Sequence, residues 1–368
     1  MSNLRHALLT LSFTPGLGPR KIKGLLEHFG SASVVAEASA TDLRATEGIG
    51  PKLAQTIAGL RGESSKKADA ELARAERLGV TLLALGEADY PASLAHIYDP
   101  PPILYVRGTL PPGVQGELLD LRSLGVVGTR NASPYGLDLS RRFSRELAQS
   151  GIAIVSGLAL GIDSAAHEGA LEVPGGQTIA VLGSSVEIIY PGQNKRLAER
   201  ILEKRGAIVS EYRLGTAPRA ENFPGRNRII NGLSRGILVV EGGKKSGALI
   251  TADYALEEGR SIFAVPGRLG DPKAEGALEL LKQGAVLTGS SDDILSEFGW
   301  AAGAARPAKT LPGGFAGELA RLIRDRGETL LDDLIAATGK SAPELLPTLM
   351  TLELDGVVRT LPSGRYIV

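Results

Sequence analysis

The chain has 368 residues, carries 41 basic and 41 acidic residues, and contains no cysteine. Its zero net charge excludes a general attraction to polyanions, so nucleic-acid binding would require a local cationic surface. The absence of cysteine excludes disulfides, thiol catalysis and thiolate metal sites, and the length allows two or three domains.

Neither the histidines nor the hydropathy pattern indicates a metal site or a membrane segment. His6, His28, His96 and His167 lie too far apart for a short metal-binding motif. No apolar run reaches the length of a membrane span, and the N-terminal residues lack an apolar segment followed by a small-residue cleavage site. We therefore expect a cytoplasmic protein without a resident cofactor, metal or membrane contact.

Residues 1–62 are predicted to form a small helical domain with an internal repeat. A Gly-apolar-Gly-Pro turn occurs at Gly16–Pro19 and again at Gly48–Pro51, each time before a helix with one apolar face. The turns resemble the helix-hairpin-helix motif, which presents backbone N–H groups to a nucleic-acid phosphate. A packing role is an equal alternative, because two helices joined by a tight turn need glycine in either case. Four basic residues beside the turns fit phosphate binding: Arg20, Lys21, Lys23 and Lys52.

Residues 63–300 are predicted to form an extended Rossmann-like core, a doubly wound and mostly parallel α/β sheet. A charged helix at Ser64–Leu78 precedes a series of short apolar runs, which are typical of strands buried on both faces. Helical segments separate the later runs, as crossover connections require. The predicted strands are Val80–Leu85, Ile103–Gly108, Leu124–Val127, Ile152–Val155, Ile179–Leu182, Ala207–Ser210, Ile237–Val240, Ser261–Val265 and Ala285–Leu287.

Two loops rich in small residues follow the strands at the start of the parallel series. Gly128–Gly136 and Ser156–Asp163 each lead from a strand into a helix N-terminus. Because the helix dipole and its first backbone N–H groups attract negative charge, these loops indicate an anion pocket at the carboxyl edge of the sheet.

The C-terminal part is predicted to contain a linker and a third domain. Residues 301–314 are rich in Ala, Gly and Pro and read as the linker. Residues 315–368 show three amphipathic helices, a turn at Pro362–Gly364 and a closing hairpin, which is the winged-helix pattern. This segment contains six basic and eight acidic residues, so we expect it to contact protein, with weak DNA contact as the alternative.

Catalytic motifs are incomplete in this chain. Gly242–Ser246 is reminiscent of a P-loop, but Lys245 stands where a Ser or Thr must bind magnesium. Gly232–Gly236 matches the nucleophile-elbow string in the wrong order of strand and helix. Asp163 and His167 are four residues apart, and a structural pair at the start of a helix is the simpler interpretation.

Cationic and small polar residues instead accumulate after successive strands. Arg and Lys beside exposed backbone amides suit a chain of phosphates, and one mononucleotide would not need so many groups. Aromatic residues make up only 4% of the sequence, so an extended base-stacking platform is not expected. The groups are Arg130, Gly183–Ser185, Tyr190–Arg196, Phe223–Arg228 and Lys244–Gly247.

An ordered set of motifs resembles the DNA-processing protein A family, called DprA or Smf. It covers most of residues 80–290 and includes Val126–Arg130, Ser156–Asp163, Phe223–Ile230 and Ser246–Ala252. The resemblance implies a core without catalytic activity that binds single-stranded DNA, forms a homodimer and helps load the RecA recombinase in natural transformation. It also implies the helical and winged-helix domains predicted above. The double lysine Lys244–Lys245 departs from the shorter loop that often occurs in the family.

The strand-end residues and the positions that the resemblance assigns to the DNA pocket make up the predicted DNA-binding set. It comprises Gly128, Thr129, Arg130, Ser133, Ser156, Gly157, Gly161, Gly183, Ser184, Asn194, Lys195, Arg196, Phe223, Arg226, Asn227, Arg228, Lys245 and Ser246.

Two further functions are compatible with the sequence. The same anion pocket would serve a nucleotide hydrolase or phosphoribohydrolase, with Asp163, His167 or Glu241 in acid/base roles. Alternatively, the core would be an inert dimerisation platform.

Overall fold

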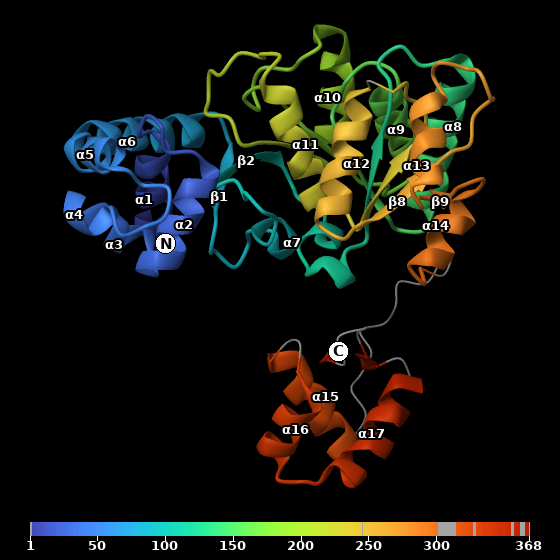
Figure 1. The fold of residues 1–368 in the computed structure, drawn as a ribbon. Helices are drawn as coiled ribbons and strands as arrows, with labels where there is room; N and C mark the ends of the chain where they lie inside the picture. The colour runs from blue at the N-terminus through green and yellow to red at the C-terminus, as the bar shows by residue number, and fades with distance from the viewer. Residues whose placement is uncertain are drawn as a thin grey trace. The chain divides into compact units, whose positions relative to one another are not determined.

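The structure, a computed structural model, describes residues 2–244, 246–300, 314–326, 329–354, 357–360 and 365–367. The chain divides into two compact units, residues 1–303 and 304–368 (Figure 1). None of the described helices is both long and apolar enough to cross a membrane.

The N-terminal part of the first unit is helical. The two predicted turns have matching backbones: Gly16 and Gly48 are left-handed, at φ +79° and +77°, which favours glycine. In both, an extended second glycine then caps a helix that begins with proline. The helices are α1 (Ser2–Ser12), α2 (Pro19–Phe29), α3 (Ala32–Glu37), α4 (Ala40–Leu43), α5 (Pro51–Gly59) and α6 (Arg61–Arg77).

A nine-stranded sheet forms the centre of the unit, in the order β1-β2-β6-β5-β4-β3-β7-β8-β9. The strands from β6 to β9 are parallel, whereas β1 and β2 join antiparallel at one edge, so the prediction of a mostly parallel sheet is confirmed. The bounds are β1 (Thr81–Ala84), β2 (Ile103–Gly108), β3 (Ser123–Val127), β4 (Ala153–Ser156), β5 (Thr178–Val181), β6 (Ala207–Ser210), β7 (Gly236–Val239), β8 (Ser261–Ala264) and β9 (Val286–Leu287).

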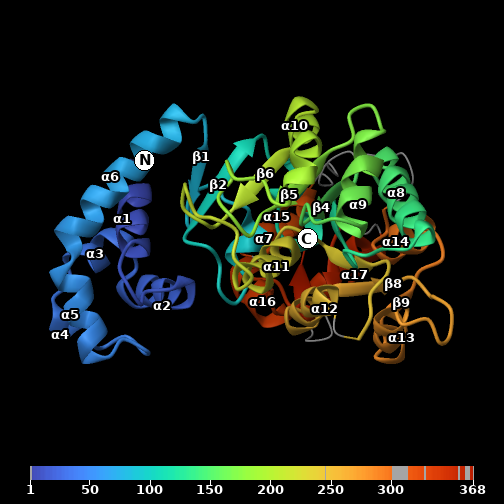
Figure 2. The same ribbon diagram turned by 90° about the horizontal axis from the view of Figure 1, so that it is seen from above.

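Helices cover both faces of this sheet, as Figure 2 shows from above. Alternate strand residues therefore enter different cores: Ile154 of β4 packs with Phe143 and Ile162, while its neighbour Val155 packs with Ile230 on the other face. One face carries α8 (Pro134–Gln149), α9 (Ile162–Leu171), α10 (Lys195–Glu203) and α14 (Ser291–Glu297). The other carries α7 (Ala92–Ala95), α11 (Asn222–Gly232), α12 (Gly247–Glu257) and α13 (Glu275–Lys282). Short 3-10 turns occupy Pro112–Val114, Leu118–Asp120 and Gly192–Asn194.

The strand order reverses direction at β3. From β3 the chain proceeds through β4, β5 and β6 on one side, and returns to β7, β8 and β9 on the other. Connections therefore diverge above the carboxyl end of β3 and leave a crevice, the usual ligand position in such sheets.

Buried hydrogen bonds join the helical part to the sheet. Glu71 of α6, only 7% exposed, accepts hydrogen bonds from the Tyr105 hydroxyl at 2.9 Å and from the Leu214 backbone N–H at 2.8 Å. A single apolar core continues from α1–α6 to β1, β2 and α10. The placement of these helices against the sheet is thus fixed by packing and not by a linker.

The second unit contains α15 (Gly314–Arg326), α16 (Leu331–Thr338), α17 (Ala342–Leu354), β10 (Arg359–Thr360) and β11 (Tyr366–Ile367). β10 and β11 pair antiparallel, and Leu319, Leu334 and Leu349 lie in the core of this unit. The prediction of three helices followed by a hairpin is confirmed. The predicted linker, except Gly314, and the predicted hairpin turn at Pro362–Gly364 lie outside the described residues.

Candidate functional site

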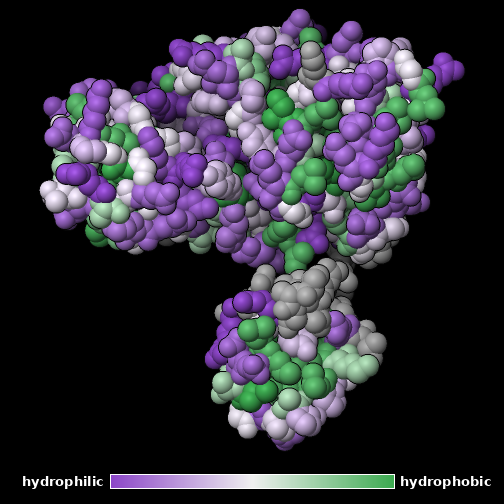
Figure 3. Space-filling view, in the orientation of Figure 1, coloured by the Kyte–Doolittle hydropathy of each residue, from purple (hydrophilic) through white to green (hydrophobic). Residues whose placement is uncertain are grey.

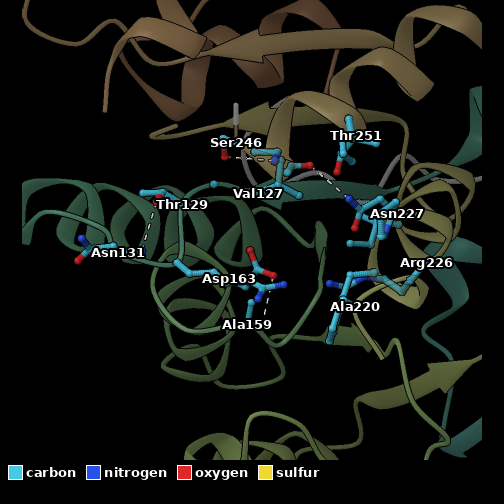
Figure 4. A pocket seen from close by; sticks show the side chains of 18 of the residues that line it. Val127, Thr129, Asn131, Ala159, Asp163, Ala220, Arg226, Asn227, Ser246 and Thr251 are labelled. Carbon is cyan, nitrogen blue, oxygen red and sulfur yellow. Dashed lines mark hydrogen bonds between the residues drawn. The ribbon is translucent and has the colours of Figure 1, made fainter. Parts of the chain in front are cut away.

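A pocket of about 820 Å³ opens at the strand-order reversal, above the carboxyl ends of β3, β4 and β7 (Figure 4). We call it the switch-point pocket. Segments distant in the sequence meet here because all these loops leave the same edge of a parallel sheet. The lining residues are Val127–Asn131, Ala159, Asp163, Tyr190, Pro218–Ala220, Phe223, Pro224, Arg226, Asn227, Ile230, Gly243, Ser246–Ala248, Ile250 and Thr251.

An aromatic and cationic stack forms part of the pocket wall. The Arg130 guanidinium carbon lies 5.0 Å from the centroid of the Phe223 ring. The Tyr190 ring centroid is 5.8 Å from that of Phe223, and Tyr190 is 44% exposed. Phe223 packs on Gly183, where an added Cβ would be 2.9 Å from the ring. The stack therefore offers an aromatic surface and a positive charge side by side at a solvent-accessible position.

Arg226 lies at the base of the pocket and is only 4% exposed. Its Nη1 donates to the carbonyl oxygen of Gly157 at 2.6 Å and to that of Val181, so the side chain joins the ends of β4 and β5. Within the described part of the chain, its Nε has no hydrogen-bond partner. Burial lowers the pKa of Arg226 to about 10, against the opposing effect of Asp163, so the guanidinium remains charged at neutral pH.

Carboxylates of the chain itself occupy the N-terminal ends of α8 and α9. Asp163 accepts hydrogen bonds from the backbone N–H groups of Gly157 (3.1 Å) and Ala159 (3.3 Å). Burial raises the pKa of Asp163, while Arg226 opposes that shift. Glu241 accepts from the backbone N–H of Ser133 at 2.7 Å and from its hydroxyl at 2.6 Å. The sequence predicted that the backbone amides of these loops bind an external anion. In the structure, the side-chain carboxylates of Asp163 and Glu241 accept hydrogen bonds from several of those amides.

The N-terminal end of α12 forms another side of the pocket. Ser246 caps the helix by accepting from the Ala248 N–H at 3.3 Å, and Asn227 donates to the Gly247 carbonyl at 3.3 Å. Lys244 in the preceding loop is exposed. Lys245 lies outside the described residues, so its role in DNA binding stays a prediction.

The predicted DNA-binding residues separate into groups in the structure. Seven line the switch-point pocket together: Gly128, Thr129, Arg130, Phe223, Arg226, Asn227 and Ser246. Gly157, Gly161 and Gly183 allow close packing, since a Cβ would clash with the Arg226 guanidinium at Gly157 and with the Thr129 carbonyl at Gly161.

Several predicted residues support the loops from below. The Ser156 hydroxyl donates to the Val126 carbonyl at 2.7 Å, and Asn194 donates to the Leu158 carbonyl at 2.8 Å. The Ser184 hydroxyl donates to the Ile188 carbonyl at 2.7 Å. These side chains are buried and hold the loop backbone, whereas Ser133 caps α8.

The other described cations of the predicted set, Lys195, Arg196 and Arg228, are not in the pocket lining. Arg228, two residues after Arg226, is 4% exposed and bonded to Asp99 (3.0 Å) and Glu211 (2.6 Å). Lys195 and Arg196 are exposed on α10.

Sequence reasoning did not single out the segment Pro218–Ala220, which lines the pocket between β6 and α11. A usable signal existed, because the segment follows a predicted strand as the other lining loops do. Asp163 was considered only as an acid or a structural residue, yet it lies on the pocket floor beside the Thr129 loop and opposite Arg226 (Figure 4).

The three candidate acid/base residues have separate environments. His167 is fully buried, and its Nδ1 lies 2.7 Å from the Thr178 hydroxyl. Glu241 is bound to the start of α8, and only Asp163 of the three lines the switch-point pocket. Among the described residues, no group of three or more His, Asp or Glu could hold a metal ion.

The fold and the pocket define a doubly wound α/β protein with a ligand crevice at its strand-order reversal; along the sequence, a helical tandem precedes this core and a winged helix follows it. A family model described as DNA recombination-mediator protein A matches residues 81–299, and the chain belongs to this DprA/Smf family. Models of a SAM-like helix-hairpin-helix tandem and of the DprA winged-helix domain match residues 8–58 and 319–364.

Relatives support this assignment along the whole chain. Protein Smf of Synechocystis is 35% identical and aligns over 100% of this chain and 99% of its own. The X-ray structure of DNA processing protein A from Streptococcus pneumoniae has a TM-score of 0.66 and 35% identity, covering 80% of this chain and 98% of that one. A structure concerned with the single-stranded DNA binding mode of the Helicobacter pylori protein has a TM-score of 0.51 and 30% identity, covering 59% and 94%.

Proposed function

We propose that this protein binds single-stranded DNA in the switch-point pocket and acts as a recombination mediator that protects incoming DNA and helps load the RecA recombinase in natural transformation. The observation that carries the DNA-binding part is the Arg130–Phe223–Tyr190 stack at the pocket. The binding mode named for the Helicobacter pylori relative supports the same ligand. The recombinase and transformation steps rest on family membership.

The chemistry of the pocket suits a strand whose bases are unpaired. An unpaired base presents a π-face that stacks on Phe223 or Tyr190, and each such contact is worth about 1–3 kcal/mol. Arg130 and Arg219 would hold the adjoining phosphates. Because the whole chain has no net charge, attraction to DNA would arise from this local group of cations.

We also propose a homodimer formed through the Rossmann-like core. β9 is the open edge of the sheet, and its Leu287 is 61% exposed. An edge strand with an exposed apolar side chain is a natural surface for a second copy.

The alternative of a nucleotide-processing enzyme has less support. Its candidate residues Asp163, His167 and Glu241 would have to act on one substrate, but their side chains bind different parts of the protein. His167 is also fully buried. A mediator requires only that the pocket hold a strand.

The experiment that tests DNA binding is fluorescence anisotropy with a labelled single-stranded oligonucleotide. Arg130→Ala and Phe223→Ala should each weaken binding by about tenfold, since each removes a phosphate or stacking contact. Lys204→Ala is the matched control, because Lys204 is an exposed cation at the far end of α10. Wild-type affinity in both pocket variants would refute the proposed site.

A further inference from the structure

A second cationic hollow lies at the first helical hairpin. A cavity of about 660 Å³ is lined by Ser12–Gly18, Lys67 of α6 and Arg213. We call it the hairpin hollow. Arg213 belongs to the core and reaches the helical part, where its guanidinium carbon lies 4.5 Å from the centroid of the Phe13 ring. The hollow is therefore built jointly by two parts of the chain.

One loop connects this hollow with the switch-point pocket. In the β6–α11 loop, Arg213 lines the hollow and Pro218 and Arg219 line the pocket. Five residues span at most about 18 Å, the distance covered by roughly five nucleotides of a stacked strand. The ribbon between β6 and α11 passes beside the helical part (Figure 1), and Figure 3 shows hydrophilic residues over this junction.

The loop is held in place by hydrogen bonds from three directions. Glu71 accepts from the Leu214 N–H at 2.8 Å, and Arg74 donates to the Leu214 carbonyl at 3.3 Å. The Gly215 N–H donates to Glu187 at 2.6 Å. Leu214 itself is buried in the core shared with α1–α6. The position of Arg213 is thus preorganised before any ligand arrives.

The acidic residues along this loop have partners of their own. Glu187 pairs with Arg74 at 3.1 Å, and Glu211 pairs with the buried Arg228 at 2.6 Å. Arg213 and Arg219 are exposed. Among the described residues, Lys67 pairs with the exposed Glu63 and Arg219 with the exposed Glu221, and such surface pairs contribute little to stability and exchange readily. The loop consequently presents available positive charge at both of its ends.

We propose that the hairpin hollow is a second binding site for the phosphodiester backbone, occupied by the strand that leaves the switch-point pocket along the β6–α11 loop. Arg213 and Lys67 hold its phosphates. This inference rests on the proposed function and adds a second contact site for the same DNA strand. The second hairpin at Gly48–Lys52 has the same backbone conformation but lies outside both cavities, so it takes no part.

The test compares oligothymidylates of about three and about twenty nucleotides, one shorter and one longer than the roughly five nucleotides that cover the distance between the two sites. The full-length variant with Arg213→Gln and Lys67→Gln is measured by fluorescence anisotropy. The matched control carries Arg44→Gln and Arg77→Gln, two exposed cations of the helical part that line neither cavity. Thermal unfolding of each variant verifies its fold.

We expect the hollow variant to lose about 25-fold in affinity for the long oligonucleotide at 0.1 M salt. It lacks two phosphate contacts, and the loss of each contact lowers the affinity about fivefold. Its salt slope should fall by about 1.4, and its binding of the short oligonucleotide should equal that of the wild type. Unchanged binding of the long oligonucleotide, or an equal loss in the control variant, would overturn the second site. If the wild type binds neither length, the proposed function itself fails.

Discussion

Three ionisable side chains beneath the switch-point pocket are almost wholly buried: Asp163, His167 and Arg226. Arg226 and Asp163 each satisfy loop groups, so their charges stabilise backbone that would otherwise be left unpaired. His167 differs, because the Thr178 hydroxyl donates to the Ile154 carbonyl at 2.7 Å and so accepts from His167 Nδ1. Its buried Nε2 has no partner in the described part of the chain.

Protonation of His167 should therefore destabilise the fold. Burial lowers its pKa to about 3, whereas an unfolded chain has a value of about 6.5. Between these values only the unfolded chain takes up the proton, so the free energy of unfolding falls by about 1.4 kcal/mol per pH unit as the pH decreases. His167→Asn keeps a donor for Thr178 and removes this titration.

Thermal unfolding at a series of pH values from about 7 to 4 checks this expectation. The wild type should lose more stability than His167→Asn over that range. Asp163 has the opposite effect. Because its pKa is raised in the folded protein, protonated Asp163 adds to the free energy of unfolding at low pH, and this contribution is lost as the pH rises through the folded-state pKa. Since Asp163 is common to both proteins, the difference between them isolates His167, and parallel profiles would contradict its role.

At the scale of elements, loops at one edge of the sheet build the pocket and an open strand ends the sheet. The loop before α8 contacts the loops before α9 and α12: the Thr129 N–H donates to the Glu241 carbonyl at 2.7 Å, and Gly128 lies too close to Ile162 to carry a Cβ. β9 is different in kind, because it has only two residues and Leu287 projects into solvent.

If the proposed homodimer forms through β9, Leu287→Lys should shift the protein toward the monomer, because a buried ammonium would need desolvation in an apolar interface. Light scattering coupled to size exclusion measures the mass directly. Leu256→Lys, which replaces another exposed leucine on α12, serves as the control. A dimer that survives Leu287→Lys would place the contact elsewhere on the core.

At the scale of the whole molecule, the first unit ends with its own closing contacts. Trp300 is 6% exposed, and its ring centroid lies 4.5 Å from that of Phe298. The second unit has a separate core, and the winged-helix segment within it, residues 315–368, contains eight acidic and six basic residues. Neither feature suggests that the second unit supplies phosphate contacts.

A protein ending after Trp300 should accordingly keep single-strand affinity within about twofold of the full-length value, because independent parts contribute additively. Gel shifts with single- and double-stranded oligonucleotides compare the two forms. Loss of single-strand binding on truncation would show that the winged helix contributes contacts. Loss confined to the duplex would assign it a separate role.

The sequence by itself determined the order of elements, the paired glycine turns and the edge of the sheet that carries the pocket. Those features depend on local conformation and on periodicity, which neighbouring residues encode. Seven of the predicted site residues do line one pocket, among them Arg130 and Phe223.

Only the tertiary structure decided which of the polar residues face the pocket. Arg226 and Arg228 belong to one motif, but two residues on a helix differ by about 200°, so one lies under the pocket and the other binds Asp99 and Glu211. Likewise, the carboxylates that occupy the starts of α8 and α9 include Glu241, which is more than a hundred residues distant from Ser133. Such pairings depend on how the chain returns to the same edge of the sheet, and local sequence does not encode that distance.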